Sequence, residues 1–240
     1  PAGTGQLIGQ DVPRLDLPSK LDGSANFAGD VRLPDMVFAA IRQGPIGDTK
    51  LKSFNRQGAA KITGFIDVVK GETWIAAVAT NWWAANRALD KMSPVFETKG
   101  FLPDSDKIDT ALQAALDDGD GIRFVSRGET KGVFQKDNSV RARYHADAAI
   151  HAPIETRTAT ADYKDGGLEL WMATQAPVAA VQAAARALNI GQDRVTLYPM
   201  LSGGSFDRNL DNDIAGQVAL IARQMERPVH LVWSRAEDLM

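Results

Sequence analysis

The chain has 240 residues, 44% hydrophobic and 24% charged, which is the composition of an ordinary globular protein and excludes a disordered, fibrous or coiled-coil one. Its 27 lysines and arginines nearly balance 30 aspartates and glutamates, so the net charge of −3 gives no basic surface for nucleic acid. The absence of cysteine excludes disulfides, thiolate nucleophiles, cysteine-ligated zinc and iron–sulfur clusters from this chain. The most apolar run, Trp74–Ala85, is interrupted by Thr80 and Asn81 and is too short to cross a membrane.

The first half of the sequence predicts a strand–turn–strand–helix unit. After an extended lead-in to about residue 24, we expect strands at Met36–Arg42, Ala60–Val69 and Trp74–Thr80. Asn81 can cap a helix that buries Trp82, Leu89 and Met92 and ends before Pro94. A second helix starts with Ser105 as N-cap, carries Ile108, Leu112, Ala115 and Leu116 on one face, and closes at Gly119.

The second half mixes hairpins with strand–helix–strand repeats. The turn Asp117–Gly121 is the predicted domain boundary, which divides the chain into residues 1–118 and 119–240. Beyond it we expect strands at Ile122–Ser126, Ser139–Tyr144, Thr158–Tyr163, Leu168–Ala173, Arg194–Pro199 and Val229–Trp233. An alanine-rich helix follows Pro177 and ends at Asn189, and a later helix buries Ile214, Val218, Ile221 and Met225. The fold class is therefore α+β or mixed α/β.

Two neighbouring loops are candidate binding sites. The loop Ser202–Arg208 follows a predicted strand and carries Gly203 and Gly204, whose backbone can approach an anion closely and offer it N–H groups. It matches neither nucleotide-binding glycine pattern, so a plain strand–helix turn is an alternative. Gln175 lies between a strand end and a helix start, where a neutral amide donor suits an oxyanion or oxo group, or serves as a helix cap.

Other candidate sites are weaker. Gly203-Gly204-Ser205-Phe206 nearly forms a nucleophile elbow, but Asp207 replaces the last glycine and His230 follows too closely for a triad. His145, His151 and Glu155 could converge on a metal, although Pro153 spoils a shared helix face. The turn Asp117–Gly121 lacks the ligands of an EF-hand, and the tryptophans Trp74, Trp82 and Trp83 are interpreted as core.

Several segments occur in the order found in one enzyme family. They are the lead-in Ile8–Gly23 with Asp30–Met36, the run His151-Ala152-Pro153-Ile154-Glu155, the run Thr174-Gln175-Ala176-Pro177, the loop Gly203–Arg208 and the stretch Arg227–Arg235. Together they resemble the large, molybdenum-cofactor-binding subunit of the xanthine dehydrogenase/aldehyde oxidase family, of the isoquinoline 1-oxidoreductase beta-subunit type. The resemblance implies an α/β-hammerhead domain over residues 1–118 and the first part of a mixed α/β molybdopterin-binding domain over residues 119–240.

The resemblance also implies a function. It implies a hydroxylase that inserts water-derived oxygen at a carbon of an N-heteroaromatic ring or an aldehyde. The molybdenum cofactor, in its cytosine dinucleotide form, would accept the electrons, and a separate iron–sulfur subunit would carry them away. By matching position, Gln175 would hydrogen-bond an oxo ligand of molybdenum, and Gly203, Gly204, Ser205, Phe206, Asp207 and Arg208 would lie beside the metal and pterin. Relatives with an export signal favour the periplasm.

Two departures from the family pattern stand out. Asp207 replaces a glycine and puts a carboxylate beside an anionic cofactor, which should weaken binding unless Arg208 neutralises it. The family's general-base glutamate lies beyond Met240, so no catalytic residue is assigned here. Because both ends read as cut, we expect the chain to be part of a longer subunit and, alone, neither to hold the cofactor nor to turn over.

Two other functions stay open at this stage. The chain could be a non-catalytic assembly module with the same fold that docks an iron–sulfur partner. It could also be an unrelated protein that binds a small anion or a nucleotide at Gly203–Arg208.

Overall fold

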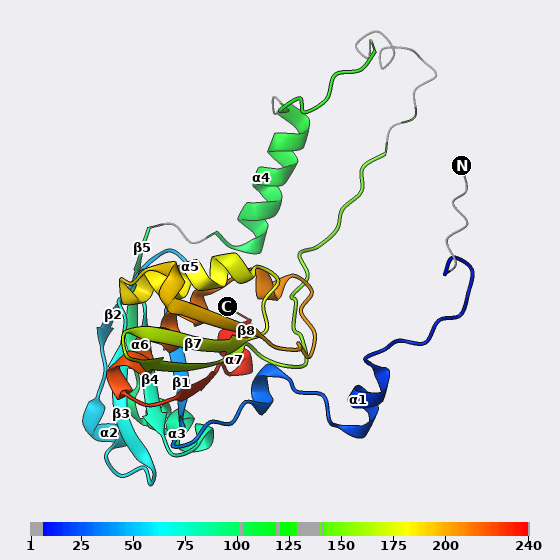
Figure 1. The fold of residues 1–240 in the computed structure, drawn as a ribbon. Coiled ribbons are helices and arrows are strands. Elements are labelled where there is room, and N and C mark those ends of the chain that lie inside the picture. The colour runs from blue at the N-terminus through cyan, green and yellow to red at the C-terminus, as the bar shows by residue number, and fades with distance from the viewer. Residues whose placement is uncertain (1–6, 101–102, 119–120, 129–139, 141, 240) are drawn as a thin grey trace. The chain divides into compact units, whose positions relative to one another are not determined.

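The computed structural model describes residues 7–100, 103–118, 121–128, 140 and 142–239 (Figure 1). It divides into two compact units. The first comprises Pro1–Thr98 together with His151–Met240, and the second is Lys99–Ile150.

A mixed seven-stranded sheet organises the first unit, in the order β3-β4-β1-β9-β6-β7-β8. Its strands are β1 (Val37–Gln43), β3 (Phe65–Lys70), β4 (Trp74–Ala79), β6 (Thr158–Lys164), β7 (Gly167–Met172), β8 (Val195–Pro199) and β9 (Val229–Val232). The two halves of the chain join where β1 pairs in parallel with β9, with Phe38 opposite His230. Strands from both sides of position 118 therefore share one sheet, and the division into 1–118 and 119–240 stays a prediction.

Helices cover both faces of this sheet. On one face lie α2 (Arg56–Ala59) and α3 (Trp82–Met92), and on the other lie α5 (Pro177–Leu188) and α6 (Asp213–Met225). Successive residues of a strand point to opposite faces, so Ile75 and Ala77 join the first core while Ala76 and Val78 join the second. Every residue of β4 is buried, which explains why its sequence is apolar without alternation.

Shorter elements complete the unit. They are α1 (Leu17–Asp22), the 3₁₀ helices η1 (Ala28–Asp30), η2 (Gln192–Arg194) and η3 (Arg208–Leu210), the helix α7 (Arg235–Asp238), and the strands β2 (Asp48–Ser53) and β5 (Val95–Lys99). The last two form a separate two-stranded sheet that the sequence analysis did not predict. The lead-in, expected to be extended, contains α1, but none of its residues is buried.

Local signals predicted most elements of this unit. Asn81 caps α3 as expected, because its side-chain oxygen accepts the Ala84 N–H at 2.9 Å. The hairpin β6–β7 turns through Asp165 and Gly166, both with positive φ. Two details were wrong: β3 starts at Phe65 rather than at residue 60, and Trp83 is 65% exposed with Arg87 over its ring instead of in the core.

The second unit contains α4 (Ser105–Asp118). Its capping side chain is Asp104, which accepts the Lys107 N–H at 2.9 Å, and Ser105 lies inside the helix. The strand expected at Ile122–Ser126 is not formed, because a short apolar run needs a partner strand for its backbone hydrogen bonds. The strand expected at Ser139–Tyr144 lies partly outside the described residues, and its described members are not in a strand.

Membrane-spanning length was also tested. Within the described ranges, no helix combines the length and the apolar character that crossing a membrane requires.

Candidate functional site

The candidate site is built from two loops at the ends of neighbouring strands. One loop joins β7 to α5 and carries Thr174 and Gln175, and the other leads from β8 into η3. The Gln175 N–H donates to the Asn209 carbonyl at 3.0 Å. Thr174 Oγ1 accepts the Ala176 N–H and donates to Asn212 Oδ1, each at 3.0 Å. These bonds hold the two loops side by side.

The Gln175 side chain contacts two residues of the opposite loop. Ser205 Oγ donates to Gln175 Oε1, and Gln175 Nε2 donates to Asp207 Oδ1 at 3.1 Å. The predicted juxtaposition of Gln175 with the glycine loop is confirmed. The alternative interpretation of Gln175 as a helix cap is wrong, because Ala176 is the N-cap of α5 and no side chain caps there.

The backbone of the second loop forms a cradle of donors. Gly204, Phe206 and Asp207 have φ of 108°, 52° and 69°. For Phe206 this left-handed conformation is strained, and strain of this kind gathers at ligand sites. Within the part of the chain that the structure describes, the backbone N–H groups of residues 204–207 donate to no acceptor. Consecutive free N–H groups with left-handed residues between them suit an anion.

Glu155 anchors this loop from below. Its carboxylate accepts the Gly203 N–H at 2.7 Å and the Gly29 N–H at 2.9 Å, and its own N–H donates to the Gly203 carbonyl at 3.2 Å. A Cβ at Gly203 would lie 2.6 Å from the Glu155 Cβ, so the contact requires glycine. Sequence reasoning considered Glu155 only as a metal ligand and missed this role; its sole signal was its place in the family-like run after Pro153.

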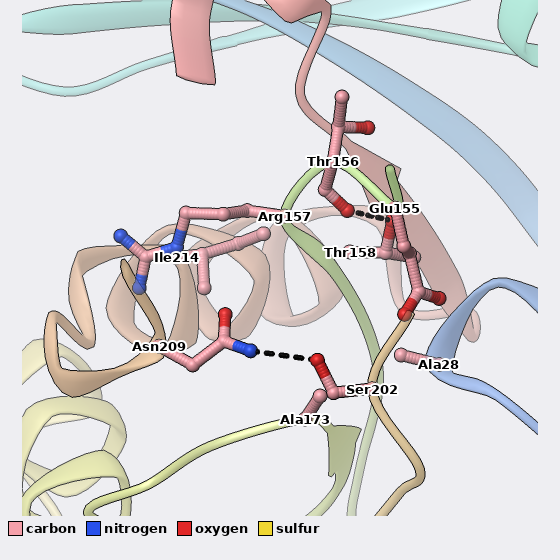
Figure 2. A pocket seen from close by; sticks show the side chains of 9 residues that line it. All are labelled: Ala28, Glu155, Thr156, Arg157, Thr158, Ala173, Ser202, Asn209 and Ile214. Atoms are coloured by element: carbon pink, nitrogen blue, oxygen red, sulfur yellow. Dashed lines mark hydrogen bonds between the residues drawn. The ribbon is translucent and has the colours of Figure 1, made fainter. Parts of the chain in front are cut away.

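A small cavity lies beneath the loop (Figure 2). Its lining consists of Ala28, Glu155, Thr156, Arg157, Thr158, Ala173, Ser202, Asn209 and Ile214. The space inside is about 10 Å³, which is the size of one water molecule. It cannot hold a substrate, so the open side of the loop, where residues 204–207 and Gln175 lie, is the surface available to a ligand.

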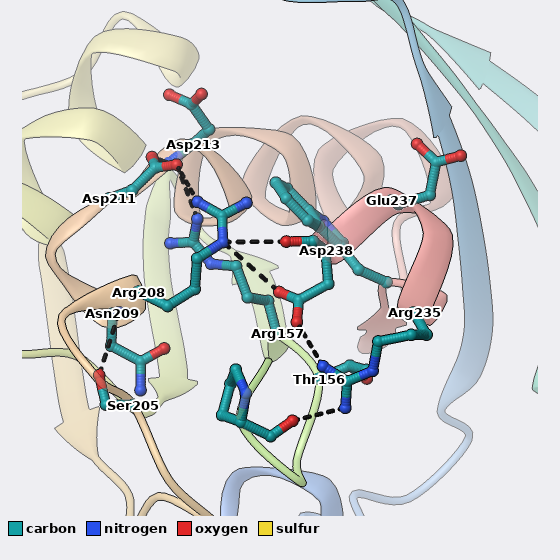
Figure 3. Close-up of polar contacts among 12 residues, drawn as sticks. Thr156, Arg157, Ser205, Arg208, Asn209, Asp211, Asp213, Arg235, Glu237 and Asp238 are labelled. Atoms are coloured by element: carbon teal, nitrogen blue, oxygen red, sulfur yellow. Dashed lines mark hydrogen bonds and ion pairs between the residues drawn. The ribbon is translucent and has the colours of Figure 1, made fainter. Parts of the chain in front are cut away.

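Arg208 points away from Asp207 (Figure 3). Its Nη1 donates to Asp211 Oδ2 at 3.0 Å, its Nε donates to the Asp238 carbonyl at 3.1 Å, and its guanidinium lies 5.7 Å from the Trp233 ring centre. The side chain is only 14% exposed. Arg208 therefore fixes the base of the loop, and it does not form the ion pair with Asp207 that would neutralise that carboxylate.

The same cluster contains a buried arginine. Arg157 Nη1 lies 2.8 Å from Asp211 Oδ2 without a well-aligned hydrogen bond, and burial lowers the pKa of Arg157 although Asp211 opposes the change. Burial alone would raise the pKa of Asp211, but Arg157, the Asp213 N–H and Arg208 lower it. Burial, reinforced by Asp211, raises the pKa of Asp213. The charges at the base of the loop thus compensate one another.

The remaining candidate residues have structural contacts. His230 is 3% exposed and shares a 2.7 Å hydrogen bond between its Nδ1 and Thr160 Oγ1, while Ser205 bonds to Gln175, so no Ser–His pair is formed. His145 Nε2 lies 2.8 Å from Asp147 Oδ1. The described residues hold no group of three metal-ligating side chains. The acidic turn after Asp117 lies partly outside the described residues, and Asp117 itself pairs with Arg143.

Solved structures share this arrangement of strands and helices. Quinoline 2-oxidoreductase from Pseudomonas putida 86 superposes with a TM-score of 0.73 at 20% identity, covering 96% of this chain and 35% of that chain. The aldehyde oxidoreductase from Desulfovibrio gigas superposes with a TM-score of 0.75 at 17% identity, covering 96% and 31%. The fold is that of part of a molybdenum hydroxylase large subunit.

Sequence comparison gives the family. The profile of the molybdopterin cofactor-binding domain matches residues 116–240, so the chain belongs to this family. It is 28% identical to the beta subunit of isoquinoline 1-oxidoreductase from Brevundimonas diminuta, over 98% of this chain and 32% of that protein. It is 26% identical to a nicotinate dehydrogenase polypeptide from Pseudomonas putida, over 97% and 20%. The chain thus spans a third or less of the length of these two relatives.

Proposed function

We propose that this chain supplies one wall of the cofactor pocket of a molybdenum hydroxylase. The observation that carries the proposal is the adjacency of the Gln175 amide to the unused N–H groups of residues 204–207. These donors suit a pterin cofactor with a pyrophosphate and oxygen ligands, and Gly204 lets the backbone approach it closely. Asp207 is the one residue whose charge opposes such a group.

When bound, the cofactor would supply the redox centre that takes two electrons from the substrate carbon. The chain's own residues bind and orient it: the backbone of residues 204–207 donates hydrogen bonds, and Gln175 offers an Nε2 hydrogen to an acceptor atom. Glu155 and Arg208 keep the loop in place.

The finer parts of the proposal come from the resemblance and the relatives' names. The cofactor is the cytosine dinucleotide form of molybdopterin, a separate iron–sulfur subunit takes the electrons, and the rest of the large subunit supplies the opposite wall and the general base. The substrate is an N-heteroaromatic compound or an aldehyde, in keeping with relatives named for isoquinoline and nicotinate. No described residue of this chain performs the proton transfer.

The test is the metal content of the natural polypeptide that carries this sequence, isolated from its source cells after growth with molybdate. We expect about one molybdenum per chain, and a Gly204→Val variant should lose most of it because a side chain at φ 108° disrupts the cradle. Gly23→Ala is the matched control, since Gly23 also has positive φ but lies in open space. A metal-free natural protein, or a Gly204→Val variant with full metal, would overturn the proposal.

A further inference from the structure

Gln175 is held by two side chains of opposite hydrogen-bonding character. The Ser205 hydroxyl accepts the Asn209 N–H at 3.2 Å, and its single hydrogen is given to Gln175 Oε1. A carboxylate oxygen of Asp207 accepts from Gln175 Nε2 at 3.1 Å. A flipped amide would put Nε2 against the Ser205 hydrogen and Oε1 against the Asp207 carboxylate. Only one orientation satisfies both partners.

Neither contact can be made by the glycines of the family-like loop. Ser205 and Asp207 stand where the pattern that this loop resembles has glycine, and glycine offers no side chain to hold an amide. The backbone at Asp207 has φ 69°, a conformation that glycine adopts freely and that aspartate tolerates better than most residues. A carboxylate at this strained, anion-facing position therefore needs a compensating role.

We propose that Ser205 and Asp207 are positioning residues that lock the Gln175 amide with its Nε2 toward the cradle loop. One Nε2 hydrogen is held by Asp207, and the second has no acceptor among the residues that the structure describes. The lock fixes the direction in which this second hydrogen is offered to a ligand. The inference rests on the proposed function for the ligand's identity, but the lock itself exists in the cofactor-free chain.

The first experiment detects the lock without any cofactor. In the ¹⁵N-labelled 240-residue chain, the Gln175 side-chain amide should show two widely separated proton shifts and slowed rotation about its C–N bond. Asp207→Asn keeps an acceptor oxygen and should preserve this signature, whereas Asp207→Gly should collapse it to that of Gln57, an exposed glutamine without a side-chain hydrogen bond in the described structure. Ser205→Ala should weaken it in part.

The second experiment measures molybdenum in the natural polypeptide. Asp207→Asn should retain as much as the unchanged protein, and Asp207→Gly should retain about five-fold less, the effect of about one hydrogen bond on a binding equilibrium. If Asp207 acted only by repelling the anionic cofactor, both variants would gain metal equally, and that result would overturn the lock.

The two readouts separate the lock from the proposed function. An unchanged Gln175 signature in Asp207→Gly disproves the lock whatever the metal content. A lock seen by resonance in a protein that never holds molybdenum supports the positioning contacts and disproves the function. Asp207→Gly is expected to fold, because glycine relieves the left-handed backbone at this position.

Discussion

Glu155 should be the residue on which the shape of the cradle loop depends most. Its carboxylate accepts two backbone N–H groups, from Gly203 at 2.7 Å and from Gly29 at 2.9 Å. A hydrogen bond to a charged group contributes about 1.5–3 kcal/mol, and the lower end applies here because Glu155 is half-buried and water can replace part of each bond. Glu155→Ala should therefore lower the free energy of unfolding by about 3 kcal/mol.

Glu155→Gln separates the two bonds. Its amide has one acceptor oxygen, so one backbone N–H loses its partner and faces the NH₂ group, and the expected loss is about 1.5 kcal/mol. Urea unfolding of the 240-residue chain at pH 7 gives these values, and amide hydrogen exchange at Gly203 and Gly29 should speed up in both variants.

The control is a glutamate on the surface. Glu72 is 74% exposed and pairs with Lys50 at 3.2 Å, so Glu72→Ala should change stability by less than about 0.5 kcal/mol. If Glu155→Ala were no more destabilising than Glu72→Ala, the anchoring role derived from the two bonds would be wrong.

The other predictions concern the core and the helix caps. Burial lowers the pKa of His230 from 6.5 to about 4; the folded state thus resists protonation, and stability present above pH 6.5 should fall between pH 6.5 and 4. At about 1.36 kcal/mol per pKa unit the limit is about 3 kcal/mol, and His230→Gln should flatten this part of a pH series of urea unfolding curves; an equally steep loss in the variant would contradict the assignment. Asn81→Ala removes the acceptor of the Ala84 N–H and should cost about 1 kcal/mol, with Asn81→Asp near neutral in the same assay. Leu89→Ala opens a cavity in the core beneath α3 and should cost about 2–5 kcal/mol, against less than about 0.5 kcal/mol for truncation of exposed Trp83; similar losses for the two would refute the placement of the core.

The helices of the first unit could be predicted because their signals are local. Asn81 precedes an amphipathic run and caps α3, and the spacing of Ile214, Val218 and Ile221 defines the buried face of α6. The strand β4 was also found, since a run of six buried residues is apolar throughout. By contrast, the run Ile122–Ser126 looked like a strand, but whether a partner strand lies beside it is a property of the fold.

The sequence by itself determined these local elements and, through the order of its motifs, the family and the two loops of the site. Only the tertiary structure decided what each loop residue does. Pairing of β1 with β9, about 190 residues away, and of β6 with β9 sets the positions of the loops around η3. The fold then turns Arg208 toward Asp211, brings Glu155 under Gly203, and places Asp207 against Gln175. Contacts between residues far apart in sequence leave no periodicity or spacing to read, because they arise only when the sheet has been assembled.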